Sequence, residues 1–174
     1  VELTARPSRR EALRRIAFMP QSASAPRNLS VLETVTYLTW MRGAPWSRAR
    51  QQARQALALV DLEKMSDTRC KALSGGMQRR VWLAQALASE ADVLLLDEPS
   101  TGLDPRQRQL MLTALHRAAE TGATIVLSSH VLEDVADLAD HLVVLTHGTV
   151  AFDAAMPESL DSTWFLDVTD GVRP

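Results

Sequence analysis

The chain has 174 residues, of which 46% are hydrophobic, and a formal net charge of −2. This length and apolar content predict one ordinary domain with a core, and the charge gives no reason to expect nucleic acid as a partner. The single cysteine, Cys70, excludes an internal disulfide and favours a reducing compartment, with a packing role for its side chain. No apolar run approaches the roughly 20 residues that span a bilayer.

The first half of the chain predicts one strand followed by helices. The capping-box spacing of residues 8–11 starts a short helix through Arg15, and the apolar residues 16–19 form a short buried strand. After a polar loop, helices are expected over about 31–41 and 47–60. Because this stretch carries no strand signal, it indicates an all-helical insertion.

The second half of the chain alternates strands and helices. Ser74 is expected to cap a helix to about Ser89, and residues 93–96 are an apolar run too short for a helix, which indicates a central parallel strand. Pro105 opens a helix to about Thr121, and a second buried strand covers residues 124–127.

The last third of the chain predicts one more helix and a hairpin. The helix covers residues 132–139, and strands 142–145 and 149–152 flank Gly148. Residues 164–166 are expected to begin a further strand. The alternation of strands and helices predicts an α/β fold with a mainly parallel sheet flanked by helices.

Two adjacent carboxylates follow the predicted central strand. Asp97 leaves the sheet at its carboxyl end, where open α/β sheets bind ligands, and a carboxylate there suits Mg²⁺. Glu98 points in another direction, where a carboxylate can orient a water that attacks a γ-phosphate. Alone, the pair is equally well explained as an acidic turn that caps a strand.

A hydroxyl and two glycines precede the helix predicted from residue 75. Unpaired backbone N–H groups and the helix dipole favour an anion at a helix start. Gly75 and Gly76 allow a phosphate to approach the backbone, and Ser74 adds a hydroxyl donor. The alternative is a plain N-cap that follows a flexible turn.

These motifs, in this order, resemble the ATP-binding subunit of an ATP-binding-cassette (ABC) transporter. Residues 73–78 resemble the family signature, 93–98 the Walker B strand and 100–104 the D-loop, while Gln21 and His130 stand where the family has its Q-loop and switch histidine. The resemblance implies a P-loop NTPase-like fold with the family's helical insertion. Residues 28–33 and 129–133 are also similar to the branch that serves two-part exporters.

The resemblance implies a role for each matching residue, with ATP and Mg²⁺ as ligands. The implied catalytic residues are Glu98, His130 and Gln21, and the implied metal ligands are Asp97 and Gln21. The residues implied to contact the ATP of an opposing subunit are Ser74, Gly75, Gly76, Gln78 and, at the dimer interface, Asp104. The implied partners are a second ATPase subunit, identical or not, and a separate transmembrane permease subunit. The implied location is the cytoplasmic face of the cell membrane.

Taken singly, several of these residues have simpler explanations. Gln21 is a loop amide, His130 a strand-end histidine, and Asp104 before Pro105 a good helix N-cap. Surface or packing roles are expected for the other histidines and tryptophans: His116, His141 and His147 at the surface or in structural roles, and Trp40, Trp46 and Trp82 in packing. Arg79 and Arg80 are expected on a solvated helix face, with contact to phosphate or a partner as the alternative.

One family motif has no counterpart in the chain. The phosphate-binding loop Gly-x-x-x-x-Gly-Lys-Ser/Thr needs a lysine after a glycine, and neither Lys64 nor Lys71 has one before it. The resemblance places that loop before Val1, so we expect a partial cassette that alone is marginally stable and inactive. The alternatives are a catalytically dead or half-site regulatory subunit and a non-transport ABC ATPase.

The expected organisation is one partial ABC ATPase domain over residues 1–174. Within it, residues 1–21 run from a strand to the Q-loop, 22–72 form the helical subdomain, 73–156 carry the signature, Walker B, D-loop and switch regions, and 157–174 form a C-terminal extension.

Overall fold

The structure is a computed structural model that describes residues 11–22 and 25–171. The chain divides into two compact units, residues 1–128 and 129–174. The subdivisions expected at residues 21, 72 and 156 stay predictions. Of the helix expected from Ser8, residues 11–14 form a helical turn, and the capping residue lies outside the described part of the chain.

The first unit contains a parallel sheet of three strands in the order β1 (Ile16–Met19), β2 (Val93–Asp97) and β3 (Thr124–Ser128). On β1 and β2 the alternating side chains of one sheet face are buried, including Met19 and Leu96, which share a row of the register. The other face is more open, and Phe18 and Val126 are 54% and 55% exposed. The parallel, α/β arrangement confirms the predicted fold class.

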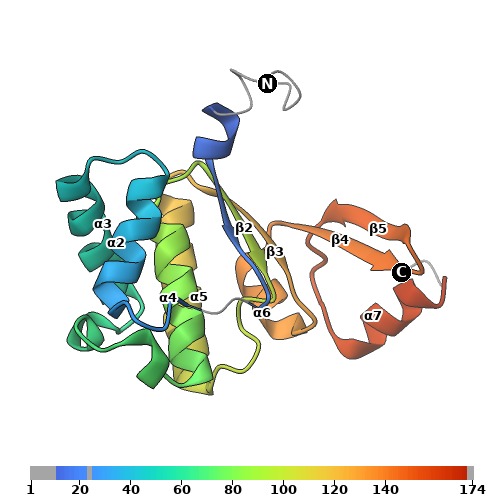
Figure 1. Ribbon diagram of the computed structural model, residues 1–174. Helices are drawn as coiled ribbons and strands as arrows, with labels where there is room; N and C mark the ends of the chain where they lie inside the picture. Colours follow the sequence, from blue (N-terminus) through green and yellow to red (C-terminus); the bar gives the residue numbers. More distant parts are fainter. Residues whose placement is uncertain (1–10, 23–24, 172–174) are drawn as a thin grey trace. The chain divides into compact units, whose positions relative to one another are not determined.

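Helices α4 (Gly75–Ala88) and α5 (Pro105–Glu120) lie beside this sheet, and α2 (Val31–Met41) and α3 (Trp46–Leu59) pack against α4 (Figure 1). Short 3₁₀ turns lie at Glu63–Met65 and Cys70–Ala72. Helix α4 contacts β1, α2, α3 and α5, so it lies at the centre of the helical layer. This central place explains why it is buried on more than one side.

Local sequence sets the start of α2, whereas a contact between distant residues sets the environment of Cys70. Ser30 and Glu33 form the reciprocal capping box, in which the Glu33 side chain accepts from Ser30 N at 2.7 Å. Cys70 is buried with its Sγ 3.3 Å from Thr34 Oγ1, as expected of a packing residue.

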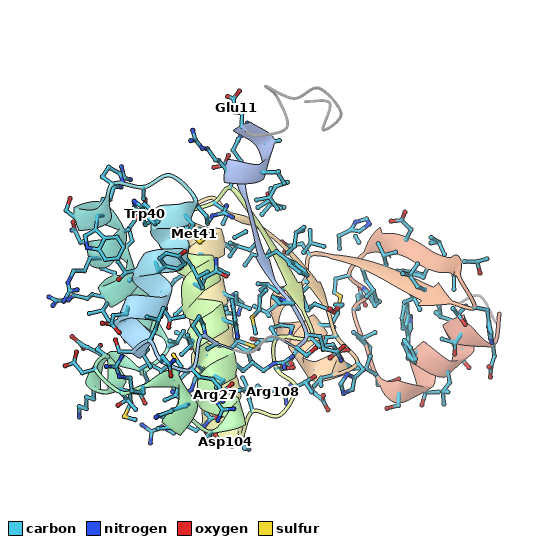
Figure 2. The ribbon with its side chains drawn as sticks, viewed as in Figure 1. Glu11, Arg27, Trp40, Met41, Asp104 and Arg108 are labelled. Atoms are coloured by element: carbon cyan, nitrogen blue, oxygen red, sulfur yellow. The ribbon has the colours of Figure 1, made fainter. Side chains whose placement is uncertain are left out.

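The expectation that Trp40 and Trp46 are packing residues is wrong. Their side chains are 46% and 49% exposed, and Trp40 contacts the rings of Trp46 and Tyr37 at the surface. Trp40 lies in the last turn of α2, after the buried residues 31, 32, 34–36 and 39. Figure 2 labels Trp40 near the end of α2.

The expectation that Arg80 lies on a solvated face is also wrong. Arg80 is buried, and its Nη1 donates to the carbonyls of Val60 at 2.8 Å and Asp61 at 3.2 Å. Those carbonyls end α3 and begin the turn after it. Because α4 is covered on several sides, positions that would face water on an amphipathic surface helix meet protein here.

The second unit contains α6 (Leu132–Leu138), the antiparallel hairpin of β4 (His141–Thr146) and β5 (Thr149–Ala155), and α7 (Ser162–Thr169). The hairpin confirms the prediction. His141 Nε2 lies 2.7 Å from Asp153 Oδ1 across it.

The strand expected at residues 164–166 is wrong, because this segment is helix α7. Asp161 caps the helix by accepting a hydrogen bond from Trp164 N at 2.8 Å. The helix places Trp164 edge-on against Phe152 of β5, with ring centroids 4.9 Å apart, and buries Val168 one turn later. An isolated apolar triplet cannot distinguish strand from helix, and here the cap decides.

Within the described ranges 11–22 and 25–171, no helix has both the length and the apolar character needed to cross a membrane.

Candidate active site

The carboxyl ends of the three parallel strands meet at one edge of the sheet. Gln21 follows β1, Asp97 ends β2, and Ser128 ends β3 directly opposite Asp97 in the register. Open parallel sheets bind ligands at this edge because the loops that leave neighbouring strands converge there.

Ser128 ties the two adjacent carboxylate residues together. Its Oγ donates to Asp97 Oδ1 at 2.7 Å and accepts from Glu98 N at 3.1 Å, while the Ser128 carbonyl accepts from Glu98 N at 3.2 Å. Ser128 was not among the predicted site residues. The signal that could have found it is a hydroxyl residue at the end of the strand that precedes His130.

Glu98 has a left-handed backbone, with φ of 51°. Non-glycine residues rarely adopt this conformation, and such residues gather at functional sites. The carboxylate is held in turn, since Thr101 Oγ1 donates to Glu98 Oε2 at 3.0 Å. Thr101 is a second residue that sequence reasoning missed, although it lies within the predicted D-loop.

The predicted signature residues gather at the start of α4. Ser74 is the N-cap, and its Oγ accepts from Met77 N at 3.3 Å, which leaves the hydroxyl proton for another acceptor. A side chain at Gly75 would enter open space, whereas a Cβ at Gly76 would lie 2.6 Å from Gln107 Oε1 of α5. Gln78 folds back, and its Nε2 donates to the Leu73 carbonyl at 3.2 Å.

Arg79 connects the strand edge with α4, so its expected place on a solvated face is wrong. The guanidinium donates to the carbonyls of Gln21, at 2.7 Å, and of Glu98 and Pro99. Burial lowers the pKa of Arg79, and the carboxylates of Asp97 and Glu98 oppose that shift.

A cavity of about 360 Å³ lies between the Gln21 loop and α4. Its walls are residues 19–22 together with Gly75, Gln78, Arg79 and Trp82. The structure thus brings Gln21 to the signature residues of its own chain.

Asp104 begins α5 as its N-cap, and its Oδ1 accepts from Gln107 N at 2.8 Å, with Pro105 in the first turn. Figure 2 shows Asp104 at the end of the first unit where α4 and α5 both begin. His130 belongs to the second unit, where it is exposed and follows Ser129, whose Oγ accepts from Val131 N at 3.0 Å.

The oxygen donors at the strand edge fit Mg²⁺. Within residues 11–22 and 25–171 no group of three or more His, Cys, Asp or Glu side chains is arranged to hold a metal. Mg²⁺ is commonly bound by only one or two protein oxygens, with water and phosphate oxygens as its other ligands. The carboxylate of half-buried Asp97 and the Ser128 hydroxyl fit this kind of site.

Comparison with known proteins places the sequence. Residues 2–101 match the family described as ABC transporter. The Nod factor export ATP-binding protein I of Burkholderia orbicola (strain AU 1054) is 35% identical over 169 residues, which are 97% of this chain and 56% of that protein. The daunorubicin/doxorubicin resistance ATP-binding protein DrrA of Streptomyces peucetius is 34% identical over 145 residues, 83% of this chain and 44% of that protein.

Solved structures agree with the fold. An ATP-binding subunit of an ABC transporter superposes with a TM-score of 0.79 at 22% identity over 99% of this chain and 68% of that one. A transporter described as a metal-chelate type ABC transporter, in an inward-facing conformation, superposes with a TM-score of 0.75. It is 29% identical, and the match covers 89% of this chain and 64% of that one. The chain spans about half the length of the curated relatives it matches. With its motifs, sheet and helices in this order, the chain belongs to the ABC transporter family.

Proposed function

We propose that this chain is part of an ATP-hydrolysing subunit that powers export across a membrane. The observation that carries the proposal is the network at the end of β2. There Ser128 fixes Asp97 and the Glu98 backbone, and Thr101 orients the Glu98 carboxylate. A metal-binding carboxylate and an aimed catalytic carboxylate are what water attack on a γ-phosphate requires.

In this mechanism Glu98 accepts a proton from water as the water oxygen bonds to the γ-phosphorus. The bond from that phosphorus to the bridging oxygen breaks, and ADP and phosphate result. Asp97 and Ser128 would hold Mg²⁺, which when bound neutralises charge on the phosphate oxygens. Gln21, which follows β1 at the same edge of the sheet, and His130 keep the roles toward Mg²⁺ and the γ-phosphate that the family resemblance implies.

The signature residues are proposed to serve the ATP of a second ATPase subunit. Support comes from the start of α4, where Gly75 has open space beside it and Ser74 keeps a hydroxyl proton for an acceptor. The first-turn N–H groups and the helix dipole attract phosphate there. Gln78 and Asp104 flank this surface.

A permease subunit is the proposed membrane partner, which would hold this protein at the cytoplasmic face. The surface offered for it is the aromatic patch, defined as Tyr37, Trp40, Met41 and Trp46, each 40% or more exposed. Exposed aromatic and methionine side chains are typical of interface cores. The relatives named for Nod factor export and for drug resistance favour an exporter over a non-transport ATPase.

The test is Glu98→Gln in the protein expressed over its full reading frame with its permease. The substitution keeps size and removes the base, so we expect ATP turnover to fall by about 10²–10⁴-fold while nucleotide binding persists. The matched control is Glu120→Gln at the end of α5, which should leave turnover unchanged. Full turnover by Glu98→Gln would overturn the proposed function.

The 174-residue chain alone is expected not to turn over ATP, because its sequence contains no Gly-x-x-x-x-Gly-Lys-Ser/Thr loop. ATP hydrolysis by the purified 174-residue chain would contradict this. A half-site regulatory role is the alternative, in which Ser74 completes a site on an intact relative. Addition of the chain to such a relative should then change its turnover, and the Ser74→Ala chain should not.

A further inference from the structure

One side chain of α4 reaches both loops of the candidate active site. Arg79 Nη1 donates to the Gln21 carbonyl at 2.7 Å, Nε to the Pro99 carbonyl at 3.3 Å, and Nη2 to the Glu98 carbonyl. These acceptors are 58, 20 and 19 residues away in sequence. The guanidinium therefore joins the end of β1 to the turn after β2.

The chemistry of these contacts requires arginine. A planar guanidinium presents five N–H donors in a fixed fork, and here three of its nitrogens address three different carbonyls. A lysine ammonium on a flexible stem carries the same charge but cannot keep three acceptors at these separate angles. Geometry rather than charge is the specific contribution of Arg79.

One of these contacts holds a residue whose backbone conformation is unfavourable on its own. Glu98 has the left-handed φ of 51°, which a non-glycine residue keeps only when its surroundings enforce it. Ser128 fixes its N–H from β3, and Arg79 fixes its carbonyl from α4. The peptide units on both sides of the Glu98 Cα are thus held by side chains from two elements.

Helix α4 carries two functions one turn apart. Its first turn, with Ser74 and Gly75, is the surface assigned to the ATP of the second subunit, and Arg79 follows within the next turn. We propose that Arg79 is a positioning residue that links the signature helix to the catalytic loop of the same chain. A displacement of α4 on closure of the nucleotide sandwich is passed through this guanidinium to Glu98 and Gln21. This inference rests on the proposed function.

The test compares Arg79→Lys and Arg79→Gln with the matched control Arg54→Gln, an exposed arginine of α3. All are made in the protein expressed over its full reading frame with its permease. We expect kcat to fall about 10- to 100-fold in both Arg79 variants, because the catalytic group is misplaced rather than removed. KM for ATP should stay within about twofold, since the Arg79 side chain binds backbone carbonyls and none of the side chains that are predicted to bind the nucleotide.

A second readout is independent of turnover. Backbone amide exchange of Glu98, Ser100 and Thr101 should accelerate in Arg79→Lys without nucleotide, while exchange within α3 and in Arg54→Gln stays at the wild-type rate. Should Arg79→Gln fail to fold, Arg79→Lys decides, because its charge is kept and only the fork is lost. Wild-type kcat and exchange in Arg79→Lys would overturn the inference.

Glu98→Gln in the same preparation separates the two proposals. If Glu98→Gln is inactive and Arg79→Lys is fully active, the proposed function stands and the role of Arg79 fails. If Glu98→Gln hydrolyses ATP at the wild-type rate, the proposed function fails and the inference fails with it.

Discussion

Replacement of Arg80 by methionine should destabilise the helical layer, and the structure sets the magnitude. Methionine keeps the unbranched apolar stem and removes the two hydrogen bonds to the carbonyls of Val60 and Asp61. A bond from a charged donor contributes roughly 1.5–3 kcal/mol, and the longer of the two counts for less. The α3 C-terminus also loses a cation, worth about 0.3–1 kcal/mol.

Relief of the desolvation of Arg80 offsets part of this loss, so we expect the free energy of unfolding to fall by about 2–3 kcal/mol. With a urea dependence of about 1–3 kcal/mol/M, the midpoint should fall by roughly 0.7–3 M. The assay is urea unfolding of the protein over its full reading frame. Tryptophan fluorescence is a suitable signal, because Trp40, Trp46 and Trp82 all lie on helices next to Arg80.

The matched control is Arg106→Met. Arg106 also approaches Asp61, with Nη2 4.0 Å from Oδ2, but its side chain is 86% exposed. An exposed pair of this kind contributes between zero and about 1 kcal/mol, so the midpoint should hardly move. If Arg80→Met loses no more stability than Arg106→Met, the reasoning from buried carbonyls is wrong.

Three further variants test single features. Gly75→Ala should leave the unfolding midpoint unchanged or slightly raised, since the new methyl meets open space, yet lower ATP turnover by crowding phosphate; unchanged turnover would contradict the signature assignment. Asp104→Ala removes the cap that accepts from Gln107 N, and calorimetry should show a loss of about 1 kcal/mol. The backbone N–H of Ser30 lowers the pKa of Glu33, so this cap stabilises fully above pH about 4.3 and weakens as the pH falls through the lowered value. Glu33→Gln should therefore have a lower unfolding free energy than wild type at neutral pH, and the two values should converge in acid. A difference independent of pH would refute the assignment.

Local patterns were sufficient for much of the fold. The start of α2 after Ser30, of α4 after Ser74 and of α5 after Asp104 all follow from caps within a few residues of the helix. The apolar run that became β2 is too short for a buried helix, which leaves a strand. The prediction of a strand at residues 164–166 was wrong, because three apolar residues are too few to show whether their period is that of a strand or of a helix such as α7.

Sequence alone therefore determined the fold class, the order of the elements up to β5 and the carboxylates at the end of β2, since these depend on neighbours along the chain. Tertiary structure decided which side chains meet. Arg79 and Arg80 read as a solvated pair, yet they bind carbonyls 58 and 20 residues away. The physical reason is that burial depends on how many sides of a helix are covered, and the acceptors for a buried guanidinium come from segments that only folding brings within reach.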